Sequence, residues 1–271
     1  MMHLFYKTVA VIILLLLFFV AGGGVSHNDR WRIDRIDIIG ANAVSTDAMR
    51  ALAGEKLLGN YFFAYARENS FLFPRAEIER ELIETFPRLK TASVSRADAH
   101  TIVATVSERK PYALWCGEVF YTEVLELADC WFVDEAGFVF DRAPVFSEGV
   151  YLKVYGTLVE ENAGEPLRGV LPYERFASAN TFAKLIRAEL GELTRIEITG
   201  NGESEITIRT SAAYPFLVGV AIRFKDGENP LSLMNNLRAA IQAQFPENVG
   251  PIKKLLYIDM RFGNKVFFGF E

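Results

Sequence analysis

Residues 8–25 read TVAVIILLLLFFVAGGGV, contain no charged side chain, and include an unbroken apolar run over residues 9–21. Their length is close to the roughly 20 apolar residues with which a helix spans a bilayer. A buried helix of a globular core would be interrupted by a polar face, and this run is not. We therefore expect a transmembrane helix over residues 8–26, in contact with the lipid bilayer, after a cytoplasmic tail of residues 1–7.

Two interpretations of this segment stay open. Ala21-Gly22-Gly23 offers a weak small-residue cleavage site of the kind found in signal peptides. An uncleaved anchor would leave the N-terminus in the cytoplasm and everything after about Ser26 outside, because long C-terminal domains translocate largely regardless of flanking charge. We favour the anchor, and a mature N-terminus near Gly23 would reject it.

The composition of the whole chain excludes several classes of protein. Of its 271 residues, 51% are hydrophobic and 23% are charged, which excludes a disordered or collagen-like chain. Its mean hydropathy of +0.15 is set largely by the N-terminal run, so the remainder has an ordinary exported composition. The 29 basic and 34 acidic residues give a net charge of −5, which argues against a nucleic-acid partner.

Hydrophobic periodicity divides the exported part at Arg109-Lys110-Pro111, where a strand ends and a proline restricts the next residue. Residues 30–109 predict the order strand, helix, helix, strand, strand. The expected elements are a strand near residues 31–38, helices over residues 46–53 and between Pro74 and Pro87, and strands over residues 91–96 and Thr101–Glu108, with loops at residues 57–73 and a hairpin turn at 97–100.

Residues 110–271 predict a strand-rich second domain. Two helices interrupt it, near residues 174–190 and 231–245, and the acidic stretch 158–168 reads as a loop. The expected strands cover residues 112–116, 130–134, 138–141, 150–155, 194–199, 205–210, 218–224, 255–260 and Lys265–Phe270. The fold class is therefore α+β, with a mixed, mainly antiparallel sheet.

The sequence offers little catalytic chemistry. His3, His27 and His100 are scattered over the tail, the linker and a turn, and there is no HExxH, GxSxG or P-loop motif. Gly200-Asn201-Gly202 leads into a strand instead of a helix, so it lacks the helix N-terminus that binds phosphate. We expect no enzymatic activity, no cofactor and no metal.

Cys116 and Cys130 lie at the end of one expected strand and the start of the next, each beside a tryptophan. Antiparallel pairing of those strands could bring the sulfurs within bonding distance, and an exported domain lies in an oxidising compartment. A disulfide and two buried free thiols both remain open.

Five motifs behind the anchor give the chain a resemblance to the FtsQ/DivIB family of bacterial cell-division proteins. Residues 36–40, 86–94 and 106–111 (VSERKP) resemble the opening strand, the second helix end and the closing segment of a POTRA domain. Residues 132–140 (FVDEAGFVF) and 257–266 (YIDMRFGNKV) resemble a hairpin and the C-terminal segment of the family's β domain. The resemblance implies a POTRA domain over residues 30–109 and an FtsQ/DivIB-type β domain over residues 110–271.

The same resemblance implies a scaffold in the cytoplasmic membrane at the division septum. Such a protein recruits FtsB (DivIC) and FtsL and through them organises septal peptidoglycan synthesis. The POTRA domain is implied in contacts with other division proteins. The long loop at residues 57–73, the cysteine pair and the acidic loop depart from the family pattern.

The residues themselves point to a binding surface near the C-terminus. If the aromatic strand Lys265–Phe270 lies at a sheet edge, its free backbone groups can pair with a partner strand. Two other interpretations stay open: the phenylalanines pack on the helix at residues 231–245, and Arg261 pairs internally with Asp259 or another acid. The candidate partner-binding residues are Tyr257, Asp259, Arg261, Phe262, Lys265, Val266, Phe267, Phe268 and Phe270.

Two alternative functions remain. The POTRA-like domain could bind extended polypeptides by edge addition at the strand over residues 91–96, as an envelope-assembly or chaperone-like protein does. A secreted, adhesin-like β protein would follow if the N-terminal segment were cleaved.

Overall fold

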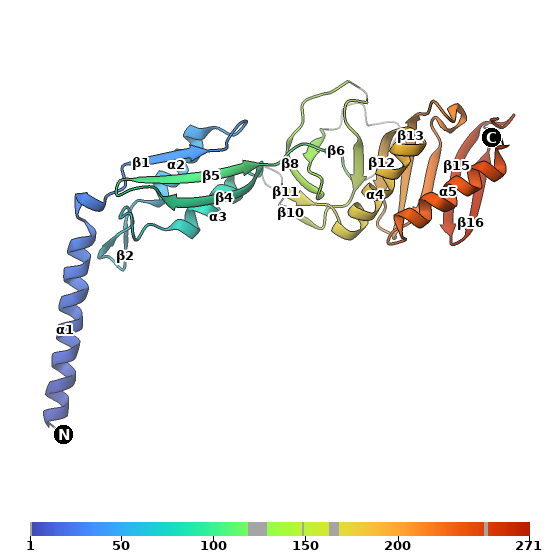
Figure 1. Cartoon of the computed structure of the whole chain (residues 1–271). Helices are drawn as coiled ribbons and strands as arrows, with labels where there is room; N and C mark the ends of the chain where they lie inside the picture. The colour runs from blue at the N-terminus through green and yellow to red at the C-terminus, as the bar shows by residue number, and fades with distance from the viewer. Residues whose placement is uncertain (1, 119–128, 148, 163–167, 247–248) are drawn as a thin grey trace. The chain divides into compact units, whose positions relative to one another are not determined.

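A computed structural model of the chain describes residues 2–118, 129–147, 149–162, 168–246 and 249–271 (Figure 1). The chain forms two compact units, Met1–Arg109 and Lys110–Glu271. Each unit has its own cluster of buried apolar side chains. The overall class is mixed α+β, with an N-terminal apolar helix and one large mixed sheet.

The first unit begins with the helix α1, Met2–Ser26. Its segment Tyr6–Ser26 is long and apolar enough to span a membrane. Nearly all of the side chains between Tyr6 and Val25 are exposed, in contrast to those of a helix in a globular core. A helix that is apolar on every side needs an apolar surrounding, which a bilayer supplies.

The rest of the first unit packs two helices on a three-stranded sheet with the order β1-β5-β4, in which β1 is parallel and β4 antiparallel to β5. Ile78, Leu82 and Met49 are the buried side chains through which the helices meet this sheet. The elements are η1 (Asp29–Trp31), β1 (Arg35–Ile39), α2 (Thr46–Lys56), β2 (Asn60–Tyr61), β3 (Tyr65–Ala66), α3 (Arg75–Thr85), β4 (Leu89–Arg96) and β5 (Thr101–Glu108).

Two contacts join the loop after β1 to the end of β5. Gly40 has φ +93, and a Cβ there would lie 2.1 Å from the carbonyl oxygen of Val106, so the position requires glycine. The Glu108 carboxylate accepts hydrogen bonds from the N–H groups of Asn42, Ala43 and Val44 at 2.7, 2.9 and 3.0 Å. These contacts give the segments at residues 36–40 and 106–111 a structural role in setting the start of α2.

The segment at residues 57–73 differs from the expected loop. It contains the short hairpin β2–β3, in which Tyr61 pairs with Tyr65. The expected strand near residues 31–38 is also shorter, because Asp29–Trp31 forms a 3-10 turn and β1 begins only at Arg35. The N-cap Asn28, whose side chain accepts from the N–H of Arg30, favours that turn over an extended start.

The second unit is an eleven-stranded sheet with the order β10-β11-β8-β7-β6-β9-β12-β13-β14-β15-β16. The pairs β6–β9, β9–β12 and β14–β15 are parallel, and the other described pairs are antiparallel. Its elements are β6 (Ala113–Trp115), β7 (Trp131–Val133), β8 (Phe138–Arg142), β9 (Lys153–Gly156), β10 (Glu160–Asn162), β11 (Arg168–Val170), α4 (Tyr173–Glu189), β12 (Glu192–Ile198), β13 (Glu203–Thr210), η3 (Pro215–Leu217), β14 (Ala221–Lys225), α5 (Pro230–Gln244), β15 (Leu255–Phe262) and β16 (Lys265–Phe270).

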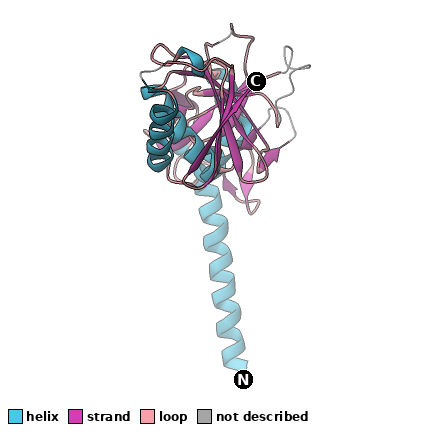
Figure 2. Cartoon of the chain, turned by 90° about the vertical axis from the view of Figure 1, so that its right-hand side faces the viewer, coloured by secondary structure: helices cyan, strands magenta, loops and turns pink. Residues whose placement is uncertain are grey.

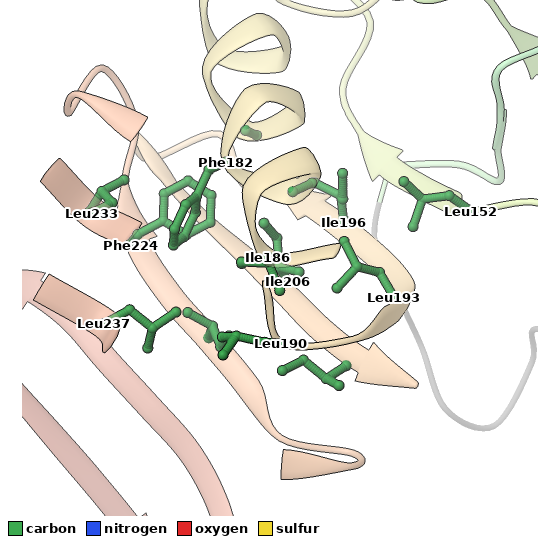
Figure 3. Close-up of a cluster of buried hydrophobic side chains, with 14 of the residues drawn as sticks. Leu152, Phe182, Ile186, Leu190, Leu193, Ile196, Ile206, Phe224, Leu233 and Leu237 are labelled. Atoms are coloured by element: carbon green, nitrogen blue, oxygen red, sulfur yellow. The ribbon is translucent and has the colours of Figure 1, made fainter. Parts of the chain in front are cut away.

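The main core of this unit lies between the sheet and the helices α4 and α5, which pack beside each other and are seen on one side of the strands in Figure 2. Phe182 of α4 meets Phe224 of β14 edge to face, with ring centroids 5.0 Å apart (Figure 3). Ile186 and Leu237 are fully buried in the same cluster. Each such side chain stabilises the unit by about 1.5–3 kcal/mol relative to an exposed one.

The expected loop at residues 158–168 is wrong in part, because β10 and β11 form there as an antiparallel pair. β10 is the first strand of the sheet, and one side of an edge strand faces solvent. Glu160 and Glu161, whose polarity favoured a loop in the sequence, therefore lie in a strand at the edge of the sheet.

The strands β6 and β7 pair antiparallel, with Trp115 opposite Trp131. Cys116 and Cys130 follow and precede these tryptophans, and their sulfurs form a disulfide. Cys116 is buried in a small aromatic cluster with Phe132, Phe140 and Tyr155.

Candidate interface at the sheet edge

The strand β16 is the last strand of the large sheet. It pairs with β15 on one side, and in the described part of the chain no strand pairs with its other side. The nine candidate binding residues all lie on these two strands or at their ends. The structure therefore brings the whole predicted set together at one sheet edge.

One face of β16 belongs to the core. Val266 and Phe268 are half-buried against the main cluster, and Phe268 meets Phe245 at the end of α5 edge to face, with centroids 5.5 Å apart. The ring of Phe270 also approaches Phe245, at 6.5 Å. The interpretation that these phenylalanines pack on the helix is therefore correct for Phe268 and partly correct for Phe270.

The other face leaves apolar rings in solvent. Phe267 is 49% exposed and Phe262 is 58% exposed, and their rings contact each other at 5.3 Å. Successive side chains of a strand point to opposite faces, which explains why Phe267 and Phe268 differ. Lys265 is exposed at the start of the strand.

Arg261 of β15 holds two acidic side chains. Its guanidinium donates to Asp259 at 2.9 and 2.6 Å and to Glu203 of β13 at 2.5 Å. Hydrogen bonds from Arg261 lower the pKa of the Asp259 carboxyl, and this effect outweighs burial, which would raise it. Hydrogen bonds to Asp259 and Glu203 in turn raise the pKa of Arg261. Asp259 and Arg261 therefore stay charged and act within the sheet, as the internal-pairing interpretation expected.

Tyr257 also serves the sheet itself. It lies opposite Gly269 of β16, where a Cβ would come within 2.2 Å of the tyrosine ring. The guanidinium of Arg223 lies over the same tyrosine ring, 4.5 Å from its centroid. Of the nine candidates, Tyr257, Asp259 and Arg261 thus shape the edge, and Phe262, Lys265, Phe267 and Phe270 present side chains on it.

A groove that sequence reasoning missed lies between α5 and β16. It has a volume of about 360 Å³, and three alanines of the helix are part of its lining. The signal in the sequence was the recurrence of Ala239, Ala240 and Ala243 on one helix face, between the polar residues Asn236 and Gln244. The lining residues are Asn236, Ala239, Ala240, Ala243, Gln244, Asn264, Val266 and Phe268.

The arrangement is suited to binding an extended polypeptide. An unpaired strand edge offers backbone N–H and C=O groups, the exposed rings offer apolar contacts on one face beside it, and the groove offers a mixed polar and apolar lining on the other. Among the described residues, no group of three or more His, Cys, Asp or Glu side chains could hold a metal ion. No family model matches the sequence, and no curated protein matches it.

Proposed function

We propose that this chain is a non-catalytic, single-pass membrane scaffold of the FtsQ/DivIB type. In this proposal, residues 8–26 anchor it in the cytoplasmic membrane with the N-terminus inside, and both units act on the outer side at the division septum. The edge of β16 binds an FtsB/DivIC-like partner, with an FtsL-like protein in the same complex, and so organises septal peptidoglycan synthesis. The observation that carries the proposal is the unpaired edge of β16.

The first unit supports the POTRA part of the proposal. Its principal elements follow the order β1, α2, α3, β4, β5, and the last strand lies between the other two. The contacts of Gly40 and Glu108 give the family-like segments a physical reason to occur together. Contacts with other division proteins are assigned to this unit.

The binding mode follows from the geometry of the edge. Strand addition supplies main-chain hydrogen bonds, and aromatic side chains beside them supply most of the binding energy in many interfaces. Phe267, exposed beside the free edge, is the anchor to test. Phe268 is a poor target because it also holds α5 on the sheet.

The test is a pull-down of the FtsB/DivIC-like protein of the same cell by the full chain in detergent. Removal of residues 265–271 should abolish capture, and Phe267→Glu should reduce it by tenfold or more. Tyr173→Glu is the control, because Tyr173 is also an exposed ring, 66% against 49% for Phe267, and lies at the start of α4. Capture that survives Phe267→Glu and the truncation, in chains that remain folded by circular dichroism, would reject the proposed site.

Localisation tests the wider function. A fluorescent fusion should gather at the septum of dividing cells. Uniform envelope fluorescence would reject the division role while leaving the binding edge to be explained.

A second candidate function is edge addition at β4, which is the outer strand of the first unit's sheet. It ranks lower because the Glu79 carboxylate of α3 already accepts the N–H of Val94 at 2.7 Å, which closes part of that edge. Binding of unfolded envelope polypeptides to the full chain in detergent would support it, and absence of binding would reject it. A secreted adhesin-like role requires a mature N-terminus near Gly23.

A further inference from the structure

The hairpin β2–β3 packs directly on the last turns of α1. The Tyr65 ring meets Phe19 edge to face at 5.1 Å, and its hydroxyl donates to the Phe19 carbonyl oxygen at 3.1 Å. Figure 1 shows β2 close to this end of the helix. The hairpin is therefore held against residues that belong to the apolar, membrane-length segment Tyr6–Ser26.

Two glycines of α1 make this packing possible. A Cβ at Gly22 would lie 2.8 Å from the Tyr65 hydroxyl, and one at Gly23 would lie 2.8 Å from the Ala64 carbonyl oxygen. A Cβ at Gly24 would meet nothing within 4 Å. The small residues that suggest a cleavage site in the sequence thus serve, in the structure, as the surface on which the hairpin rests.

Polar contacts at the end of α1 fix the hairpin further. The Ser26 hydroxyl accepts the N–H of Ala66 at 3.0 Å, and the side-chain amide of Asn69 donates to the Ser26 carbonyl oxygen at 2.9 Å. Ser26 and Asn69 are both buried. Since the packing reaches from Ser26 back to Phe19, it covers about 10 Å of the helix at the usual rise per residue.

The tip of this hairpin is an unusual place for phenylalanine. Phe62 and Phe63 are 79% and 100% exposed and have φ angles of 48° and 63°, a backbone region that bulky residues rarely adopt. Turns of this kind favour asparagine and glycine. Two strained residues whose rings face solvent do not stabilise the folded unit, so we look for a binding partner outside the unit that contacts them.

We propose that the Phe62-Phe63 tip inserts into the lipid bilayer beside α1, at the boundary between headgroups and acyl chains. The proposal rests on the membrane anchoring of α1 proposed above. Aromatic rings favour that boundary, and the tip lies beside the part of α1 that would occupy it. The hairpin then acts as a second membrane contact, which sets the angle at which the first unit leaves the bilayer.

The test uses the full chain in nanodiscs of phosphatidylethanolamine and phosphatidylglycerol that contain lipid spin-labelled near the headgroup. A fluorescent NBD label is attached to a single cysteine introduced as Phe63→Cys, Val20→Cys or Ala43→Cys. The two native cysteines form a disulfide and do not take the label. Val20 reports the anchor, and Ala43, exposed after the far end of β1, reports water. We expect lipid quenching at positions 63 and 20 and little at position 43.

Quenching at position 20 with none at position 63 would overturn the tip insertion and leave the anchor intact. Absence of quenching at both positions would overturn the anchor as well. In the Phe63→Cys chain, Gly23→Ala should lower the quenching severalfold because its methyl group displaces Ala64, and Gly24→Ala should leave it unchanged. Full quenching in the Gly23→Ala chain would refute the role given to the helix packing.

Discussion

At the scale of single residues, Arg261 pairs with acidic side chains from two strands, β13 and β15. It neutralises Asp259 on its own strand and Glu203 on β13, and its side chain is only 27% exposed. Hydrogen bonds to charged groups contribute more than those between neutral groups, because removal of one partner leaves the other desolvated and unpaired.

Arg261→Ala should therefore lower the free energy of unfolding by about 1–3 kcal/mol, measured by urea denaturation. Arg187→Ala is the matched control, because Arg187 forms a comparable pair with Glu192 at the surface and should change stability by less than about 1 kcal/mol. Equal effects of the two substitutions would show that the position of Arg261 in the sheet does not matter.

The charge of Asp259 also sets a pH dependence. Its pKa is lowered in the folded chain, so on acidification the unfolded chain takes up the proton first. The stability that ionised Asp259 contributes is fully present above its ordinary pKa of 3.8 and is lost as the pH falls through its lower pKa in the folded chain. The stability difference between the native chain and Asp259→Asn should shrink over that interval. A difference that stays constant down to the acid transition would contradict this.

At the scale of elements, the pairing of β6 with β7 places the disulfide across two short strands. Its cysteines are separated by 14 positions, and a crosslink over such a loop stabilises by about 3 kcal/mol, chiefly by restricting the unfolded chain. Replacement of both cysteines by serine should lower stability by about that amount.

Reductant provides the control for this prediction. Dithiothreitol should shift the urea midpoint of the native chain and leave the Cys116→Ser/Cys130→Ser chain unaffected. Labelling of both cysteines by a thiol reagent in the non-reduced, denatured protein would show that the bond is absent.

The elements that the sequence located best are those with strong local signals. The strands Thr101–Glu108 and Lys265–Phe270 were located to the residue, and the helix expected at residues 231–245 is α5, Pro230–Gln244. Asn229 caps that helix by accepting the N–H groups of Leu231 and Ser232, and Pro230 begins it. The hairpin β2–β3 and the strand β10 had no such signal, since tertiary pairing creates them.

At the scale of the whole molecule, two units with separate cores should unfold separately. Calorimetry of the full chain in detergent should give two transitions. Leu82→Ala, in the core of the first unit, should lower the free energy of unfolding of that unit by about 2–5 kcal/mol and so shift only one transition to lower temperature. The double cysteine replacement should shift only the other transition. One transition that both changes shift alike would indicate a single cooperative unit.

The sequence by itself determined the features that depend on local composition and periodicity. These are the apolar membrane-length helix, the α+β class, the approximate places of most helices and strands, and the aromatic C-terminal strand. They can be predicted from the sequence because an apolar run or an alternating pattern determines which side chains are buried away from water.

Only the tertiary structure decided which groups remain free. It placed β16 at the end of the sheet, engaged Asp259 and Arg261 with each other, opened the alanine-lined groove beside α5, and seated the Phe62-Phe63 hairpin on Gly22 and Gly23. Each of these depends on residues far apart in sequence. Strand pairing and side-chain packing between such distant residues leave no periodic pattern in the sequence. The outer edge of β16 and the packing of the β2–β3 hairpin on α1 can therefore be seen only in the tertiary structure.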